Sequence, residues 1–203
     1  MKQEKKQKQV KPTDKKVEES LSYTVEVRDK EGQVIQHISA PSRSYVQQWN
    51  QVINVLASQA DKTIKDTGGI DQSIPVGTYI LTCWTGIAGI DWGIRVGKGA
   101  TPVAITDYAL ETPLGEGTGT DEFKHQAVTF TEPSVVGSTC SFTVKRVLVN
   151  DSGATITGIR EIGTYIKLSG LNYGLGFRDV LPGAVSVPHG GSITVTYTIA
   201  VTV

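Results

Sequence analysis

The sequence is poor in cysteine, with only Cys83 and Cys140 among 203 residues. Small domains held by disulfides carry more cysteines than this, and structural zinc sites need closely spaced cysteines or histidines. Each of the two lies in an apolar, strand-like run, LTCWTG or STCSFTV. We therefore expect two small buried side chains in a reduced compartment, with neither a disulfide framework nor a metal site.

Long hydrophobic runs are also missing. No stretch approaches the roughly 20 apolar residues that a membrane helix needs. The first residues, MKQEKKQKQV, contain no hydrophobic segment of the kind found in secretory signals. We expect a protein that is made in a cytoplasm and has no contact with membranes.

Neither sign of charge is in excess, because 20 Lys and Arg balance 20 Asp and Glu. Residues 1–19 are nevertheless rich in lysine and contain no aromatic residue. We predict a disordered arm there, since it cannot bury enough apolar area to offset the entropy of ordering. The arm is interpreted as a solubilising tail or docking tether, with contact to nucleic acid phosphates as the alternative. Its lysines are Lys2, Lys5, Lys6, Lys8, Lys11, Lys15 and Lys16.

Candidate catalytic bases are few, since the chain has only three histidines. His37 ends a predicted strand, His125 lies in the charged run DEFKHQ, and His189 lies in the turn PHGG. No G-x-S-x-G nucleophile motif occurs. We expect exposed or turn histidines and no catalytic residue.

Phosphate and calcium motifs are incomplete. Gly97–Thr101 places a lysine between glycines, but the spacing is not that of a phosphate loop, so we interpret it as a solvent-facing turn. The carboxylates of Glu111 and Glu116, and the pair Asp121 and Glu122, supply only a fragment of a calcium loop. We expect hydrated loop residues, with no cofactor and no metal.

Strand patterns, by contrast, are abundant. Two alternating segments between Leu21 and Ile38 flank the turn DKEG and predict a hairpin. The last segment, SITVTYTIAVTV, alternates throughout and predicts a long strand with one buried face. One amphipathic helix is predicted from Tyr45 to about Ala60, with Ser42 or Ser44 as its N-cap.

The glycine-rich sequence from Gly86 to Gly119 predicts loops with a few short strands. Burial of Trp84, Trp92 and Tyr108 is expected to hold these loops in place. Aromatic residues exposed in such loops can instead stack on sugars. Trp92 and Tyr108 are therefore candidate surface-recognition residues.

The segment RDVLPGAVSVPHGG predicts a crossing between two sheets, because its prolines lack amide donors and its glycines permit tight turns. Arg178 and Asp179 at its start form either a partly buried ion pair or a solvated one. With about eight to ten strands, the chain is predicted to be mainly β. We expect a single domain over residues 20–203, an antiparallel β-sandwich or jelly roll with one amphipathic helix near the N-terminus.

A set of stretches along the chain is distinctive. SRSYVQQWNQVINVL is followed by IKDTGGI, by IRVGKGATPVAITDYALETPLGEG, and by GIREIGTYIKL with GFRDVLPGAVSVPHGGSITVTYTIAV. In this order, over most of residues 20–203, they resemble a family of tailed-phage virion structural proteins. The resemblance implies a β-rich, usually oligomeric particle component of the capsid-decoration, head-fibre or tail-accessory kind. It does not include the Lys-rich arm.

We therefore expect a non-enzymatic virion protein that assembles with copies of itself and contacts major capsid or tail proteins. A trimer is the first expectation, by analogy with the threefold positions of capsids. One alternative is a host-surface or carbohydrate-binding module that uses Trp92 and Tyr108. A second is a wall-degrading hydrolase that uses His125 or Glu116.

Overall fold

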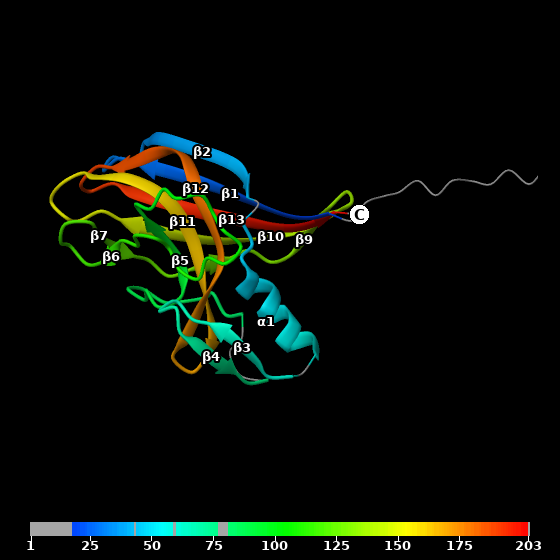
Figure 1. Ribbon diagram of the computed structural model, residues 1–203. Helices are drawn as coiled ribbons and strands as arrows, with labels where there is room; N and C mark the ends of the chain where they lie inside the picture. The colour runs from blue at the N-terminus through cyan, green and yellow to red at the C-terminus, as the bar shows by residue number, and fades with distance from the viewer. Residues whose placement is uncertain (1–17, 43, 59, 77–80, 203) are drawn as a thin grey trace, which may run out of the picture.

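The computed structural model describes residues 18–42, 44–58, 60–76 and 81–202 (Figure 1). The helix is α1 (Gln47–Ser58), and the strands are β1 (Glu18–Arg28), β2 (Val34–Ser42), β3 (Lys62–Lys65), β4 (Asp71–Ile74), β5 (Gly93–Gly97), β6 (Gly115–Glu116), β7 (Glu122–His125), β8 (Thr129–Phe130), β9 (Ser134–Val136), β10 (Thr139–Val149), β11 (Ile156–Ser169), β12 (Asn172–Val187) and β13 (Ser192–Thr202). The predicted mainly β fold with antiparallel sheets and one helix is confirmed. More strands occur than expected, because pieces as short as β6 and β8 carry no periodic pattern.

The N-terminal boundary differs slightly from the expected one. β1 begins at Glu18, so Glu18 and Glu19 pair with Thr202 and Val201 of β13. The predicted arm otherwise falls on residues 1–17, which contain all seven of its lysines and lie outside the described residues.

The larger sheet has eight strands in the order β2-β1-β13-β10-β7-β6, with β8 and β9 also paired to β10. β1 and β2 form the predicted hairpin, and β13 is the predicted C-terminal strand. Ile193, Val195 and Tyr197 of β13 are fully buried, while the threonines between them are partly exposed. The alternation in the sequence therefore marked the buried face correctly as far as Tyr197. Beyond that residue it fails, because Ile199 is only partly buried, Ala200 is buried and Val201 is 44% exposed.

The second sheet has three strands, in the order β12-β11-β5, and packs against the larger one (Figure 1). The shared core contains Val25 and Ile193 from the larger sheet, and Ile94, Ile162 and Phe177 from the second. Burying each such side chain contributes roughly 1.5–3 kcal/mol. The arrangement is β-sandwich-like.

Helix α1 and the β3–β4 hairpin form a smaller layer at one end of the second sheet (Figure 1). Val52 and Val55 of α1 are fully buried, with Ile64 of β3, Ile74 of β4 and Ile166 of β11. The helix is predicted correctly and lies within the expected range. Among the described residues, no helix is long and apolar enough to cross a membrane.

The predicted N-cap is wrong. The Ser42 hydroxyl lies 2.7 Å from that of Ser44 and donates to Asp179 Oδ2 at 3.0 Å. The helix begins instead where the Gln47 amide donates to the carbonyl of Ile105 at 3.0 Å. Both serine hydroxyls lie at the buried carboxylate of Asp179, so neither is available to cap the helix. Asp179 is far from the helix in the sequence, so this contact could not be predicted locally.

The predicted sheet crossing is shorter than expected. β12 continues as strand through Pro182 to Val187, although its register with β11 is irregular between Val180 and Val185. A proline within a strand is tolerated at such an irregularity. Only the turn 188–191, closed by a bond from the Gly191 amide to the Pro188 carbonyl, passes to the larger sheet.

Two predictions of burial are wrong. Cys140 is exposed in β10, whereas Cys83 is partly buried, and both are free thiols. Trp84 has 57% of its surface exposed and Tyr108 has 40%. The glycine-rich region is indeed mostly loop, with only β5 and β6.

Candidate functional site

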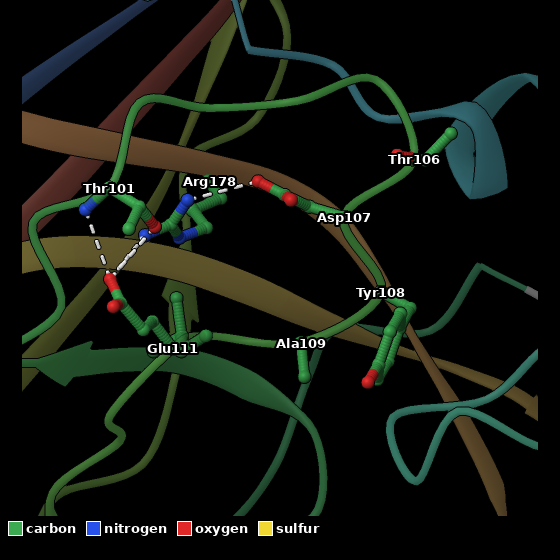
Figure 2. Close-up of a pocket in the computed structure, with 8 residues that line it drawn as sticks. Thr101, Thr106, Asp107, Tyr108, Ala109, Glu111 and Arg178 are labelled. Carbon is green, nitrogen blue, oxygen red and sulfur yellow. Dashed lines mark hydrogen bonds and ion pairs between the residues drawn. The ribbon is translucent and has the colours of Figure 1, made fainter.

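An open pocket of about 380 Å³ lies between the β5–β6 loop and β12 (Figure 2). The carbonyl of Ile105 fixes the loop to α1, and the Leu110 amide donates to the hydroxyl of Tyr165 in β11 at 3.0 Å. Neighbouring elements therefore hold this loop from both sides. The lining residues are Thr101, Thr106, Asp107, Tyr108, Ala109, Leu110, Glu111 and Arg178.

Arg178 forms the charged wall of the pocket. Its side chain is only 2% exposed, and its Nε donates to Glu161 Oε2 at 2.9 Å. Its Nη1 donates to Asp107 Oδ2, also at 2.9 Å, and Nη2 lies 3.5 Å from Glu111 Oε2. Three carboxylates therefore surround one guanidinium, which leaves an excess of negative charge.

The innermost carboxylate, Glu161, is completely buried and is held by backbone amides. Its Oε1 accepts from the amides of Gly99 at 3.0 Å and Thr112 at 2.7 Å. Its Oε2 accepts from the amide of Glu111 at 3.0 Å. This carboxylate ties β11 to both ends of the loop, and the loop conformation depends on it.

The turn Gly97–Thr101 is only partly solvent-facing, because Ala100 and Thr101 are exposed whereas Gly97 and Gly99 are buried. A Cβ at Gly97 would lie 2.4 Å from Glu161 Oε1 and 2.5 Å from the Thr112 carbonyl. The turn does cradle an anion with its amides, but the anion is the protein's own carboxylate. Lys98 pairs instead with Asp121 at 2.6 Å.

Glu111 lies at the mouth of the pocket and is not simply a hydrated loop residue. Its Oε2 accepts from the amides of Ala100 and Thr101 at 2.9 and 3.0 Å, and from the Thr101 hydroxyl at 2.9 Å. The hydrogen bonds from Thr101 lower the pKa of Glu111. Glu111 is therefore ionised at neutral pH and holds the far end of the turn.

Arg178 and Asp179 do not form the expected pair. Adjacent strand residues point to opposite faces, and Asp179 lies on the other side of β12 from the pocket, where Ser42 and Tyr197 donate to its Oδ2. Burial raises the pKa of Asp179. Each of the two side chains therefore has its partners among residues elsewhere in the sequence, and not in its neighbour.

The structure separates the two predicted recognition residues. Tyr108 lines the pocket, whereas Trp92 stacks on Tyr173 with ring centroids 5.3 Å apart. Lys167 Nζ lies 5.0 Å from the centroid of the Trp92 ring. Only Tyr108 belongs to the candidate site.

A second polar cluster, which involves His125, lies inside the sandwich. His125 was expected on the surface but is fully buried, and its Nδ1 lies 2.6 Å from Glu116 Oε2. Burial first, and then the nearby charge of Arg146, lower the pKa of His125 to about 4. Arg146 is also fully buried and donates to backbone carbonyls, including that of Ile94 at 3.0 Å. This cluster connects loops to strands.

His37 and His189 are also accounted for. His37 in β2 is exposed, as expected, and His189 lies in the turn before β13, where its Nδ1 accepts a hydrogen bond from the amide of Gly153 at 3.1 Å. Across the described part of the chain, no group of three or more His, Cys, Asp or Glu side chains is arranged to hold a metal.

Sequence reasoning missed the residues on which the pocket depends, namely Glu161 and Arg178 as an ion pair. The available signal was a charge in the middle of a strand that is otherwise buried, in GIREIG and in GFRDVL. Such a charge is rarely buried without a partner.

Comparisons with protein-family models, with curated proteins and with solved structures find no match to this chain.

Proposed function

We propose that the chain is a non-enzymatic structural protein of a tailed-phage virion. It assembles into a cyclic homo-oligomer, for which a trimer is the first expectation, and contacts neighbouring capsid or tail proteins. The resemblance of its stretches to such proteins supports this, as does the sandwich-like β body. The observation that carries the proposal is an exposed apolar surface at one end of the larger sheet.

This surface, the sheet tip, consists of β9 with the adjoining ends of β10, β13 and β1. Figure 1 shows these strand ends extending beyond the second sheet. Val135 and Val136 are 70% and 77% exposed although they point to opposite faces. At the tip, therefore, neither face of the sheet is covered by another layer of the described chain.

The exposed residues of the sheet tip are also contiguous. Val135 pairs with Cys140, and Cys140 pairs with Val201, so these three side chains form a row across β9, β10 and β13. All three are exposed. Contiguous exposed apolar side chains mark interaction sites more often than scattered ones.

The sheet tip also ends in an open edge. Among the described residues β9 pairs only with β10, so its outer amides and carbonyls face away from the sheet. An unprotected edge beside apolar side chains favours pairing with another strand. A second copy of this chain, which brings the same apolar row, is the proposed occupant.

Exposed hydrophobic residues also occur away from the sheet tip, at the end of the molecule that carries the β3–β4 hairpin (Figure 1). Leu171, in the β11–β12 turn, is 85% exposed, and Ile70 projects from the β3–β4 turn. The Thr67 amide donates to the Tyr173 carbonyl at 2.9 Å, which holds the two hairpins together. Contact surfaces at two ends suit a subunit that binds both its own copies and other shell proteins. The Lys-rich arm would add a tether or a nucleic acid contact.

Sedimentation velocity of the full chain over a wide concentration range tests this assembly. We expect wild type to self-associate, and the double variant Val135→Lys/Val136→Lys to remain monomeric because lysines oppose edge pairing. The matched control is Val34→Lys/Ile35→Lys, which places the same charges on exposed positions of the edge strand β2. It should associate as wild type does. A wild-type chain that stays monomeric at its highest soluble concentration contradicts the proposal.

A further inference from the structure

The pocket beside Arg178 presents hydrogen-bond acceptors that the protein itself does not use. Asp107 Oδ2 is engaged by the Ala104 amide at 3.0 Å and by Arg178. Glu111 Oε2 is engaged by the Thr101 turn. Within the described chain, Oδ1 of Asp107 and Oε1 of Glu111 accept no hydrogen bond, and both side chains are partly exposed. They are available to a ligand that donates.

The pocket wall also holds a donor without an acceptor. Nη2 of Arg178 is buried and makes no hydrogen bond with the described residues. Its nearest carboxylate oxygen, Glu111 Oε2, is 3.5 Å away. A buried guanidinium N–H that lacks an acceptor is unfavourable, so an oxygen atom supplied by a ligand would stabilise it.

The charge of the site restricts what that ligand can be. Asp107, Glu111 and Glu161 carry three negative charges against the single positive charge of Arg178. An anionic ligand would be repelled. A simple cation would leave the Arg178 N–H without an acceptor. A hydroxyl group can accept from Arg178 and donate to a carboxylate at the same time.

An aromatic ring lies at the rim of the same pocket. Tyr108 is 40% exposed, and its other side contacts Gly69 in the β3–β4 turn so closely that a Cβ there would lie 3.3 Å from the ring. The contact with Gly69 therefore limits movement of the ring on that side, while part of the residue remains exposed to solvent. The volume of about 380 Å³ lies within the range of small-molecule sites, roughly 300–1,000 Å³.

We propose that this pocket binds a neutral sugar, either a single unit or the end of an oligosaccharide. Its hydroxyls bridge Arg178 to the free oxygens of Asp107 and Glu111, and an apolar face of the sugar ring packs on Tyr108. This activity goes beyond assembly and does not depend on the sheet tip. A monomeric variant therefore binds sugar as well as wild type does.

The test uses the full chain on an array of neutral tetrasaccharides of glucose, mannose, galactose and N-acetylglucosamine. Sialylated and sulfated oligosaccharides on the same array and a titration with spermidine serve as anionic and cationic probes. We expect binding to at least one neutral tetrasaccharide and to none of the charged probes. Failure of every neutral sugar, or binding of a charged probe instead, would overturn the assignment.

Two variants connect binding to the pocket while both members of the Arg178–Glu161 pair are kept. Tyr108→Ala should weaken binding at least about tenfold through loss of ring packing, and Glu111→Gln should weaken it through loss of an ionised acceptor. The matched controls are the exposed residues Phe130→Ala and Glu132→Gln, which lie outside the pocket and should bind as wild type does. Melting temperatures verify that each variant is folded. Unchanged binding in Tyr108→Ala, which replaces an exposed side chain, is sufficient to refute the proposal.

Discussion

Arg178 and Glu161 lie diagonally across the β11–β12 pair, since Arg178 is opposite Gly163 and Glu161 is opposite Val180, and a bond of 2.9 Å joins them. Both side chains are almost completely buried. The pair fixes the β5–β6 loop because Glu161 also accepts hydrogen bonds from backbone amides of that loop. The position of the candidate pocket therefore depends on one charged pair inside an apolar sheet.

Glu161→Gln should destabilise the fold strongly. The substitution leaves Arg178 buried without its main partner. It also removes the negative charge of the group that accepts hydrogen bonds from three backbone amides. Removing one member of a buried ion pair typically costs about 3–5 kcal/mol. Urea unfolding measures the change, with exposed Glu132→Gln as the control. A loss below about 1 kcal/mol would show that the pair does not stabilise the loop.

Gly97→Ala should also destabilise the protein, by about 1–3 kcal/mol, because overpacking forces atoms apart. The new methyl group would lie 2.4 Å from Glu161 Oε1 and 2.5 Å from a backbone carbonyl. Gly183→Ala in β12 is the matched control, since a Cβ there meets nothing within 4 Å. Thermal melting of both variants distinguishes this steric effect from a general effect of replacing glycine. Equal melting temperatures would contradict the close packing at Gly97.

The stability of the fold should depend on pH through His125. Its pKa is about 4 in the folded chain, against 6.5 for an ordinary histidine. Between these values the unfolded chain takes up a proton that the folded chain does not. The contribution of His125 to the free energy of unfolding is therefore fully present above about pH 6.5 and is lost as the pH decreases toward 4. The loss from this group is on the order of 3 kcal/mol.

His125→Gln should therefore flatten the decline in unfolding free energy between pH 7 and pH 4.5. His37→Gln, at an exposed position in β2, should keep the wild-type slope. Urea unfolding at several pH values gives both slopes. The interpretation is wrong if wild type and His125→Gln lose stability in parallel.

The two thiols should differ in reactivity. Cys140 is exposed at the sheet tip, whereas burial raises the pKa of Cys83 to about 11. Iodoacetamide should modify Cys140 first, because the thiolate is the reactive form. In assembled material Cys140 should become protected, and peptide mass spectrometry reports both sites. Equal labelling of Cys140 in monomer and assembly would mean that the tip is not buried.

The fold could be predicted where the chain repeats a simple rule. Ile193, Val195 and Tyr197 alternate with threonines, and each is buried as the alternation requires. Val52 lies on the apolar face expected of the helix and is fully buried. Local periodicity is sufficient to predict such elements, because the polarity of each side chain indicates whether it is buried or exposed.

The candidate site could not be predicted in the same way, because its contacts join distant residues. Arg178 meets Asp107 from a loop, and Ser42 bonds to Asp179 instead of capping the helix. His125 is buried because Glu116 of the neighbouring parallel strand β6 supplies a partner. A charged residue inside an apolar strand predicts that a partner exists, but not which residue it is.

The copy number of this chain in purified virus particles tests the central claim most directly. Particles are purified on density gradients from cells that express the chain in its natural context, and quantitative mass spectrometry compares it with the major capsid protein. A structural component should be retained through purification at a fixed ratio, and a cyclic trimer should give copy numbers in multiples of three. A chain that is abundant in the lysate but absent from purified particles would contradict the account.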